Sequence, residues 1–294
     1  MHKKGELPVF FNKYKDAYLF IAPQMILFAI FMIYPIMEGA RLSLYDISLF
    51  GSEWVGFQNY IDLFGDKVFL SSVYNTLLIV FFVTVLSVGS GFFISSAIYD
   101  KSNKYISVIR GCYYLPIIIS MMVLSVIWMW LLNPAMGLIN FFFTQLGFGK
   151  IDFLGNKNSV LPVIIFIVWL STMGQSILLY VASMIGIDKS LREAAEIDGA
   201  SKWMFVYHVV YPIVKPMTMY LVVLNIINVI KVFVVIHLMT GGGPNYASST
   251  IMYLCYTEAF KFSNIGKGSA IGMVMFAIVL ALSLMQFKIF KYEV

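Results

Sequence analysis

Long runs of uncharged, apolar residues alternate along this chain with short stretches that hold most of its charge. Six of these runs approach the roughly 20 residues that an α-helix needs to cross the hydrocarbon core of a bilayer. They predict membrane-spanning helices at about residues 17–37, 77–99, 113–132, 161–186, 217–239 and 268–287. We therefore expect an all-α integral membrane protein, with a polar N-terminal segment of residues 1–16 and a single six-helix domain over residues 17–294.

A polar stretch, residues 189–216, separates the fourth predicted span from the fifth. Ser190 and Glu193 have the spacing of a capping box, in which the hydroxyl and the carboxylate satisfy free amides at a helix start. Gly199 is placed to end this helix in the left-handed conformation, and Ser201 to cap a second one. The pattern predicts two helices at about residues 189–205 that meet at a bend.

The first of these two helices has one face made mostly of small side chains. Its members recur at i, i+3, i+4 and i+7, the spacing of a single helix face: Leu191, Ala194, Ala195 and Asp198. Such a face lets another surface approach closely. We therefore read the segment as a docking site for another protein, and Glu193 as a cap, a contact or both.

The composition agrees with a membrane protein. Hydrophobic residues make up 60% of the chain and charged residues 12%, with a mean hydropathy of +0.85, whereas soluble domains carry about 25% charged residues. The net charge of +5 resides in short loops beside apolar spans. This distribution favours a role in membrane orientation over binding to nucleic acid.

The basic residues are also distributed unequally between the two membrane faces. Six spans place both termini on one face, which would carry thirteen lysines and arginines: Lys3, Lys4, Lys13, Lys15, Lys101, Lys104, Arg110, Lys189, Arg192, Lys202, Lys215, Lys288 and Lys291. The opposite face would carry six: Arg41, Lys67, Lys150, Lys157, Lys261 and Lys267. The richer face should be cytoplasmic, so we expect cytoplasmic termini and a cytoplasmic docking segment.

The sequence lacks the motifs of an ATPase or of a hydrolytic enzyme. There is no Gly-x-x-x-x-Gly-Lys-Ser/Thr phosphate loop, and the nearest stretch, Gly266-Lys267-Gly268-Ser269, has the wrong spacing. We also find no plausible catalytic triad, paired carboxylates or metal site, with only three histidines and two cysteines in the chain. We expect this chain not to be an enzyme and to bind no cofactor or metal itself.

Polar residues inside the predicted spans need a reason, because burying them in a bilayer is costly. Asn225, Asn228 and Lys231 follow one another at intervals of three on the fifth span, and Gln175 lies on the fourth. They could line a pathway for a hydroxylated substrate. Alternatively, the asparagines could join neighbouring helices, and Lys231 could extend toward the outer interface.

The docking segment resembles the cytoplasmic signature of membrane subunits from binding-protein-dependent ABC importers. The signature has Glu-Ala-Ala, three residues, Gly, nine residues and Ile-x-Leu-Pro. The matching positions here are Glu193, Ala194, Ala195, Gly199 and Pro212, and the extended sugar-permease form is matched by Asp198, Ala200, Trp203 and Phe205. Val209 and Tyr211 replace the Ile and the Leu, and Val234 stands where family members often carry Asp.

Other segments spread over the chain also resemble carbohydrate permeases of the maltose, raffinose and glycerol-phosphate type. They are residues 54–60, 75–77, 115–116, 132–140 and 240–244. The last of them, Thr-Gly-Gly-Gly-Pro, resembles the subunit that pairs with a second, different permease. The resemblance implies a type I ABC importer permease fold in a bacterial plasma membrane.

The resemblance also implies a mechanism and partners. An extracytoplasmic binding protein would deliver a sugar, of the oligosaccharide class, to a pore formed by two permease chains. Two separate ATPase subunits, which hold the ATP and Mg, would grip the Glu-Ala-Ala helix and drive alternating access. The competing hypothesis is an ion-coupled secondary carrier of a small polar solute, which would need intramembrane carboxylates or related repeats.

Overall fold

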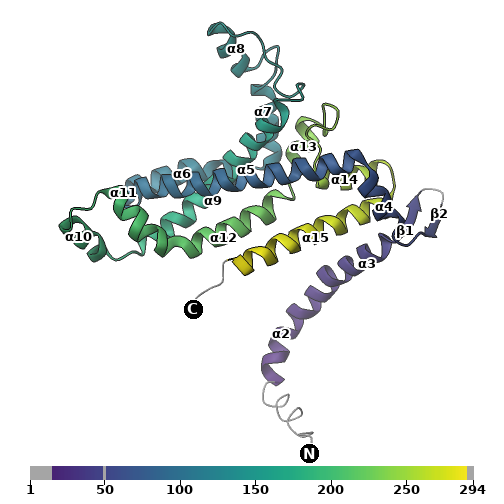
Figure 1. Ribbon diagram of the computed structural model, residues 1–294, viewed down its shortest axis with the longest axis horizontal. Helices are drawn as coiled ribbons and strands as arrows, with labels where there is room; N and C mark the ends of the chain where they lie inside the picture. Colours follow the sequence, from purple (N-terminus) through teal and green to yellow (C-terminus); the bar gives the residue numbers. More distant parts are fainter. Residues whose placement is uncertain (1–14, 49–50, 290–294) are drawn as a thin grey trace, which may run out of the picture.

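The computed structural model describes residues 15–48 and 51–289, and long helices that lie side by side form most of it (Figure 1). Within these residues, five helices are long and apolar enough to cross a membrane, or six if one sharply bent pair counts as a single span. The molecule is elongated. One end carries helices α10 and α11, and the opposite end carries a β-hairpin (Figure 1).

The first predicted span is confirmed and continues to residue 42 as one helical run, Ala17–Leu42. It consists of α2 (Lys15–Phe28), a π-helical turn η1 (Ala29–Ile33) and α3 (Tyr34–Leu42). α3 packs on the last helix, whereas α2 points away from the other helices (Figure 1). The predicted polar segment of residues 1–16 lies, except for its last two residues, outside the described part of the chain.

A short β-hairpin, not predicted from the sequence, follows the first span of the otherwise helical molecule. β1 (Tyr45–Ser48) and β2 (Gly51–Trp54) pair antiparallel, and helix α4 (Gln58–Gly65) follows them. Tyr45 lies opposite Trp54, with their rings edge to face. Strands of four residues are too short for a period-2 pattern to stand out, and the hairpin satisfies its own backbone groups locally.

Helices α5 (Lys67–Ile98) and α9 (Val160–Ile185) form the centre of the molecule and confirm the second and fourth predicted spans. α5 begins ten residues earlier than expected because Asp66 caps it, accepting a hydrogen bond from the Val68 amide. Small side chains bring the two helices close together. Ser87 and Ser176 share a hydrogen bond of 2.9 Å between their hydroxyls.

The third predicted span is not one straight helix. α6 (Asn103–Ile118) and α7 (Met121–Leu131) meet at an angle of 93°. Ile119 is extended, and Ser120 caps α7 by accepting a hydrogen bond from the Met122 amide. The break follows one turn after Pro116, which cannot donate a helical hydrogen bond. α6 also takes in most of residues 100–110, which we expected to be a basic loop.

The fifth predicted span begins earlier than expected and is interrupted before its end. α11 (Lys202–Phe205), a π-helical turn η2 (Val206–Val210) and α12 (Tyr211–Val229) follow one another without a gap. The π-turn lies just before Pro212, whose missing amide it accommodates. The chain leaves the helix at residues 230–233 and resumes as α13 (Val234–Met239). Lys231 therefore lies in this break and not within a helix.

The remaining helices occupy segments that the sequence analysis treated mainly as loops. α8 (Leu138–Gln145), α14 (Ile251–Tyr256) and a π-helical turn η3 (Thr257–Lys261) fall into this group. α15 (Ile265–Ile289) confirms the sixth predicted span. We call the end with α10 (Lys189–Ile197) and α11 the pad end, and the end with β1, β2, α4 and α14 the hairpin end (Figure 1).

Candidate functional site

The start of α10 is capped by Asp188 and not by the predicted pair of Ser190 and Glu193. The Asp188 carboxylate accepts a hydrogen bond of 2.9 Å from the Ser190 amide, and this bond lowers the pKa of Asp188 below its ordinary value. Within the described part of the chain, the exposed Glu193 carboxylate makes no hydrogen bond. The capping role of Glu193 is therefore wrong, and its side chain is free to meet a partner.

The end of α10 confirms the role predicted for Gly199. Gly199 has φ +76°, and its amide donates to the Glu196 carbonyl at 3.1 Å. The Ala200 amide donates to the Ala195 carbonyl at 2.9 Å, which completes a Schellman motif. Ser201 caps α11 as predicted, accepting a hydrogen bond from the Met204 amide at 3.3 Å. α10 is therefore capped at both ends and α11 at its start.

The eight predicted docking residues divide between an outer and an inner face of the pad. Five of them are exposed: Glu193, Ala194, Asp198, Gly199 and Trp203. Ala195 and Ala200 are half-buried, and Phe205 is buried in an apolar cluster with the ends of α9 and α12. Trp203 remains partly exposed while its ring stacks on that of Phe93, with the ring centroids 5.3 Å apart.

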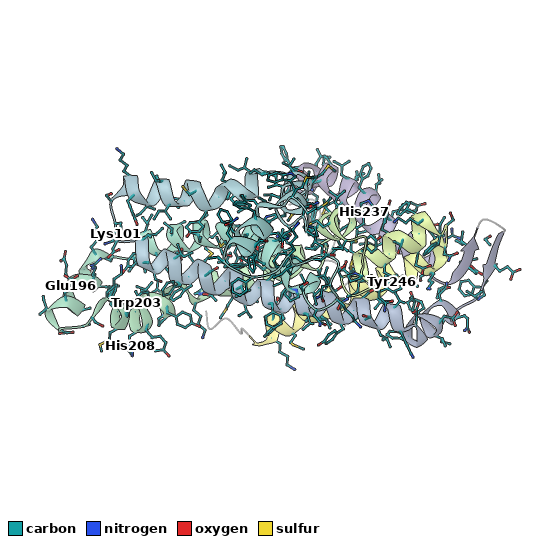
Figure 2. The ribbon with its side chains drawn as sticks, turned by 90° about the horizontal axis from the view of Figure 1, so that it is seen from above. Lys101, Glu196, Trp203, His208, His237 and Tyr246 are labelled. Atoms are coloured by element: carbon teal, nitrogen blue, oxygen red, sulfur yellow. The ribbon has the colours of Figure 1, made fainter. Side chains whose placement is uncertain are left out.

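One apolar residue of the outer face was missed by the sequence analysis. Ile197 is 87% exposed at the tip of α10, next to Asp198 and Gly199. The helical periodicity places Ile197 on no buried face. An apolar side chain in a turn expected to be exposed was therefore the available signal that Ile197 could contact a partner. Figure 2 shows Glu196 and Trp203 at the pad end, opposite the end where Tyr246 lies. The outer face is therefore a rigid, partly apolar projection from the bundle.

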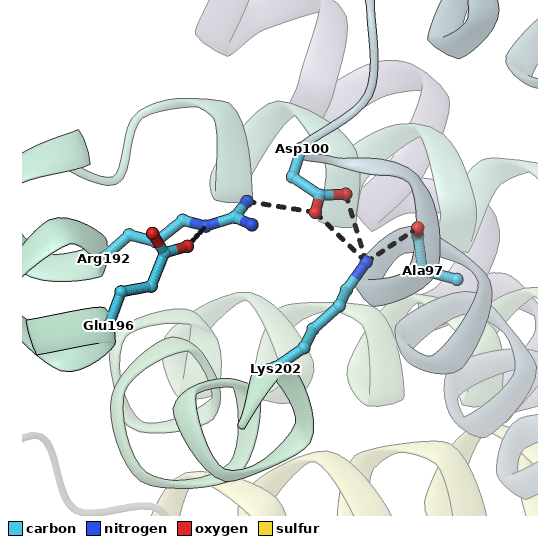
Figure 3. A network of polar contacts seen from close by, with 5 residues as sticks. All are labelled: Ala97, Asp100, Arg192, Glu196 and Lys202. Carbon is cyan, nitrogen blue, oxygen red and sulfur yellow. Dashed lines mark hydrogen bonds and ion pairs between the residues drawn. The ribbon is translucent and has the colours of Figure 1, made fainter. Parts of the chain in front are cut away.

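A single carboxylate joins both helices of the pad to the end of α5 (Figure 3). Asp100 accepts a hydrogen bond from Arg192 of α10 at 3.0 Å and from Lys202 of α11 at 3.1 Å. Lys202 also donates to the carbonyl of Ala97, in the last turn of α5, at 3.1 Å. Arg192 pairs in addition with Glu196 at 2.9 Å. The bend between α10 and α11 is thus held from a third helix.

The charges of this network are set by their neighbours. Burial tends to raise the pKa of Asp100, whose side chain is 10% exposed, but hydrogen bonds from Lys202 and Arg192 outweigh it and lower that pKa. A lowered pKa means that the stabilisation is present at neutral pH and is lost only as the pH falls through that value. Asp100 was not among the predicted site residues, although it is the only acidic residue between Asp66 and Asp152.

The four polar residues predicted to line a substrate pathway differ in their surroundings. Asn225 is 7% exposed, and its side-chain amide donates to the Leu221 carbonyl of its own helix at 2.9 Å. Gln175, Asn228 and Lys231 are exposed. Among the described residues, no group of three or more His, Cys, Asp or Glu side chains could hold a metal ion.

A second polar network lies at the hairpin end, where α5 begins. The Asn75 side-chain amide donates to the carbonyls of Tyr246 and Ser249 at 3.2 and 3.0 Å. The Ser72 hydroxyl donates to that of Ser249 at 2.9 Å, and the Thr76 hydroxyl accepts from the Ile251 amide at 2.9 Å. Residues 75–77 are thereby joined to the chain that follows residues 240–244.

Comparison with known proteins gives a consistent match. Residues 91–290 match the family described as "Binding-protein-dependent transport system inner membrane component". The chain is 34% identical to the probable ABC transporter permease protein YurN of Bacillus subtilis, over 93% of this chain and 95% of that protein. It is 30% identical to the sn-glycerol-3-phosphate transport system permease protein UgpA of Yersinia enterocolitica, over 94% of each chain.

Solved structures share the whole architecture. A chain of a bacterial alginate ABC transporter, crystallised in complex with an alginate pentasaccharide-bound periplasmic protein, superimposes with a TM-score of 0.84. The overlap covers 99% of this chain and 100% of that chain, with 22% of residues identical. This likeness covers nearly the whole chain and shows a shared fold.

Proposed function

The chain belongs to the family of binding-protein-dependent transport system inner membrane components, and we propose on this premise that it moves an oligosaccharide into the bacterial cell. It is a multi-pass membrane subunit of an ABC importer. In the proposed cycle a binding protein hands over the sugar outside, and ATP hydrolysed on separate subunits switches the spans between outward-facing and inward-facing states. The observation that carries this proposal is the exposed, capped pad on a chain of this family.

The pad supplies what a docking element for an ATPase needs. Asp188 and the Schellman motif fix the two ends of its first helix, α10. A force applied to α10 therefore moves the helix as a whole and does not unwind its ends. Its outer face presents Glu193, Ala194, Asp198 and Ile197 to a partner. ATP and Mg would be bound by two such ATPase subunits, one below each permease chain.

The first span supports the proposal of a second permease as partner. None of its most apolar 18-residue window is buried within this chain. Lipid alone could cover it, but α2 leaves the other helices and projects to one side (Figure 1). A neighbouring permease chain would give this helix a protein surface to pack on and would complete the pore as a heterodimer.

The exposed polar residues of the spans are the proposed contacts for the sugar. Gln175, Asn228 and Lys231 offer donors and acceptors that hydroxyl groups can use, and all three are exposed in this chain. Asn225 is a weaker candidate for binding the sugar, because its side-chain amide already donates a hydrogen bond to the Leu221 carbonyl. The likeness to an alginate transporter and to a glycerol-phosphate permease supports a hydroxylated substrate.

Uptake by the complete transporter tests this proposal. The chain would be reconstituted in proteoliposomes with a second permease, an ATPase and a binding protein sought among the neighbouring genes, and offered a panel of labelled oligosaccharides. We expect uptake of one sugar class that requires internal ATP and the binding protein and that survives a protonophore. Uptake that persists without ATP and collapses with the protonophore would instead establish the ion-coupled carrier.

A further inference from the structure

The Asp100 network makes the end of α5 part of the pad. Asp100 lies two residues after the last residue of α5, and its carboxylate holds one cation from α10 and one from α11. Lys202 reaches past Asp100 to the Ala97 carbonyl, within α5 itself. A displacement of the pad therefore acts directly on α5 and not only on α9 and α12, to which the pad is joined by the chain.

α5 is suited to carry such a displacement across the membrane. It has 32 residues without a break, about 48 Å at 1.5 Å per residue. The helices α6 and α7 bend by 93°, and α12 is separated from α13 by residues 230–233. α9 is also continuous, but among the described residues none of its side chains hydrogen-bonds to the loop of residues 240–250.

The far end of α5 holds the loop of residues 240–250 by side-chain hydrogen bonds. Asn75, Ser72 and Thr76 bind the segment Tyr246–Ile251 as described above. The loop is also closed on itself, since the Ser248 hydroxyl donates to the Gly243 carbonyl at 2.5 Å and to the Thr240 hydroxyl at 2.8 Å. A closed loop held by three side chains moves with the helix that holds it.

We propose that α5 is a rigid connector between the pad and the loop of residues 240–250, with Asp100 and Asn75 as its positioning residues. The inference rests on the proposed function, because it concerns how that transporter links its two membrane faces. ATP-driven movement of the pad shifts α5. α5 in turn shifts the loop of residues 240–250. It also shifts α14, because the Ile251 amide of α14 hydrogen-bonds to the Thr76 hydroxyl of α5.

The native Cys255 provides a probe of the far end. It lies on α14, and its thiol donates to the Gly268 carbonyl of α15 at 3.3 Å. A shift of α14 with α5 would break this contact and change the rate at which a maleimide modifies the thiol. The measurement uses the complete transporter in proteoliposomes with Cys112 replaced by serine and any partner cysteines also replaced, with and without Mg-ATP and vanadate.

We expect Mg-ATP with vanadate to change the Cys255 labelling rate about fivefold or more, the size of a typical coupling between sites. Asp100→Asn and Asn75→Ala should each abolish this response with resting labelling unchanged, and Asn75→Ala, which lies away from the pad, should also leave ATPase binding unchanged. Asp100→Glu should restore it, and Asp62→Asn, the same charge loss on exposed α4, should leave it intact. A purely structural role would alter resting labelling or assembly and leave the response in place.

A full response in either Asp100→Asn or Asn75→Ala would overturn the proposal. If Asp100→Asn fails to bind the ATPase, Asn75→Ala decides alone, because Asn75 lies at the hairpin end and away from the pad. The test needs no transported sugar. A transporter that takes up none of the sugars offered would therefore refute the proposed substrate and leave the connector to be judged by its labelling response.

Discussion

Gly199 is the position where one side chain would most directly disturb the pad. A β-carbon there would meet no atom within 4 Å, so the obstacle is the backbone conformation, φ +76°, and not space. Residues other than glycine lose about 1–2 kcal/mol in this region, and asparagine is among the few that tolerate it. We expect Gly199→Val to unwind the end of α10, to weaken ATPase binding and to abolish uptake while membrane insertion stays normal.

Gly199→Asn is the matched variant for this prediction. It adds a side chain of comparable size but accepts the left-handed conformation, so most ATPase binding should remain. Copurification of the ATPase with each variant from detergent, followed by uptake in proteoliposomes, measures both effects. Equal loss in the two variants would mean that a side chain at this position collides with the partner and that backbone conformation is not the cause.

The roles of several pad residues were predictable because they depend on local backbone chemistry. Gly199 and Ser201 act on amides and carbonyls within three to five residues, and sequence spacing alone fixes such contacts. Asp188 was missed because two side chains, Asp188 and Ser190, could cap the same turn. Asp100 was missed because its partners Arg192 and Lys202 lie about a hundred residues away, and no periodicity reports such a pairing.

Elements were predicted best where apolar length alone defines them. The spans at α5, α9 and α15 needed only a long run free of charge. The break between α6 and α7 falls inside an equally apolar run, so hydropathy gives no sign of it. The break after α12 contains Lys231, which was interpreted as a polar residue of a continuous span. The bend at Ser120 depends on a serine that caps a new helix, and serine is common in continuous spans as well.

The contact between α5 and α9 gives a prediction at the scale of elements. A β-carbon on Gly91 would lie 2.6 Å from Cβ of Ser176, whereas one on Gly89 would meet nothing within 4 Å. Gly91→Ala should therefore push the two helices apart and destabilise the protein by about 1–3 kcal/mol, as overpacking does. Gly89→Ala should be neutral or stabilising by up to about 1 kcal/mol, because alanine favours the helix.

Thermal unfolding of the two purified variants in the same detergent measures this difference. The decisive observation is the sign of the change in melting temperature of each variant, because Gly89 and Gly91 lie on one helix and receive the same methyl group. A lower melting temperature for Gly91→Ala alone supports close packing of α5 on α9. A similar shift in both variants would show that helix propensity and not contact dominates at these sites.

At the scale of the whole molecule, the first span is left uncovered by the rest of the chain, and the sequence could not show this. Hydropathy treats the first span like the others, although no part of its most apolar window is buried in this chain. The exposed Ile197 and the exposed polar residues of the fifth span pose the same problem. The proposed partner subunits would cover them, and this proposal draws on family membership and the fold together.

The unequal distribution of basic residues gives a prediction of orientation. Thirteen lysines and arginines accompany the pad end and the termini, against six near the hairpin end and the loops of that face, so the pad should be cytoplasmic. The test uses a variant in which Cys112 and Cys255 are replaced by serine. In intact cells whose outer envelope has been made permeable to the reagent, Ser52→Cys on the exposed hairpin should react with a membrane-impermeant maleimide. Lys101→Cys, in the exposed turn after α5, should react only in everted membrane vesicles.

Ile197→Cys separates orientation from docking in the same experiment. Like Lys101→Cys it should be inaccessible from outside, because both positions lie at the pad end. In everted vesicles, however, a docked ATPase would cover the tip of α10, so labelling should be slow until peripheral subunits are stripped with urea. Labelling of Ile197→Cys in intact cells would reverse the topology, whereas fast labelling before stripping would keep the topology and remove Ile197 from the docking face.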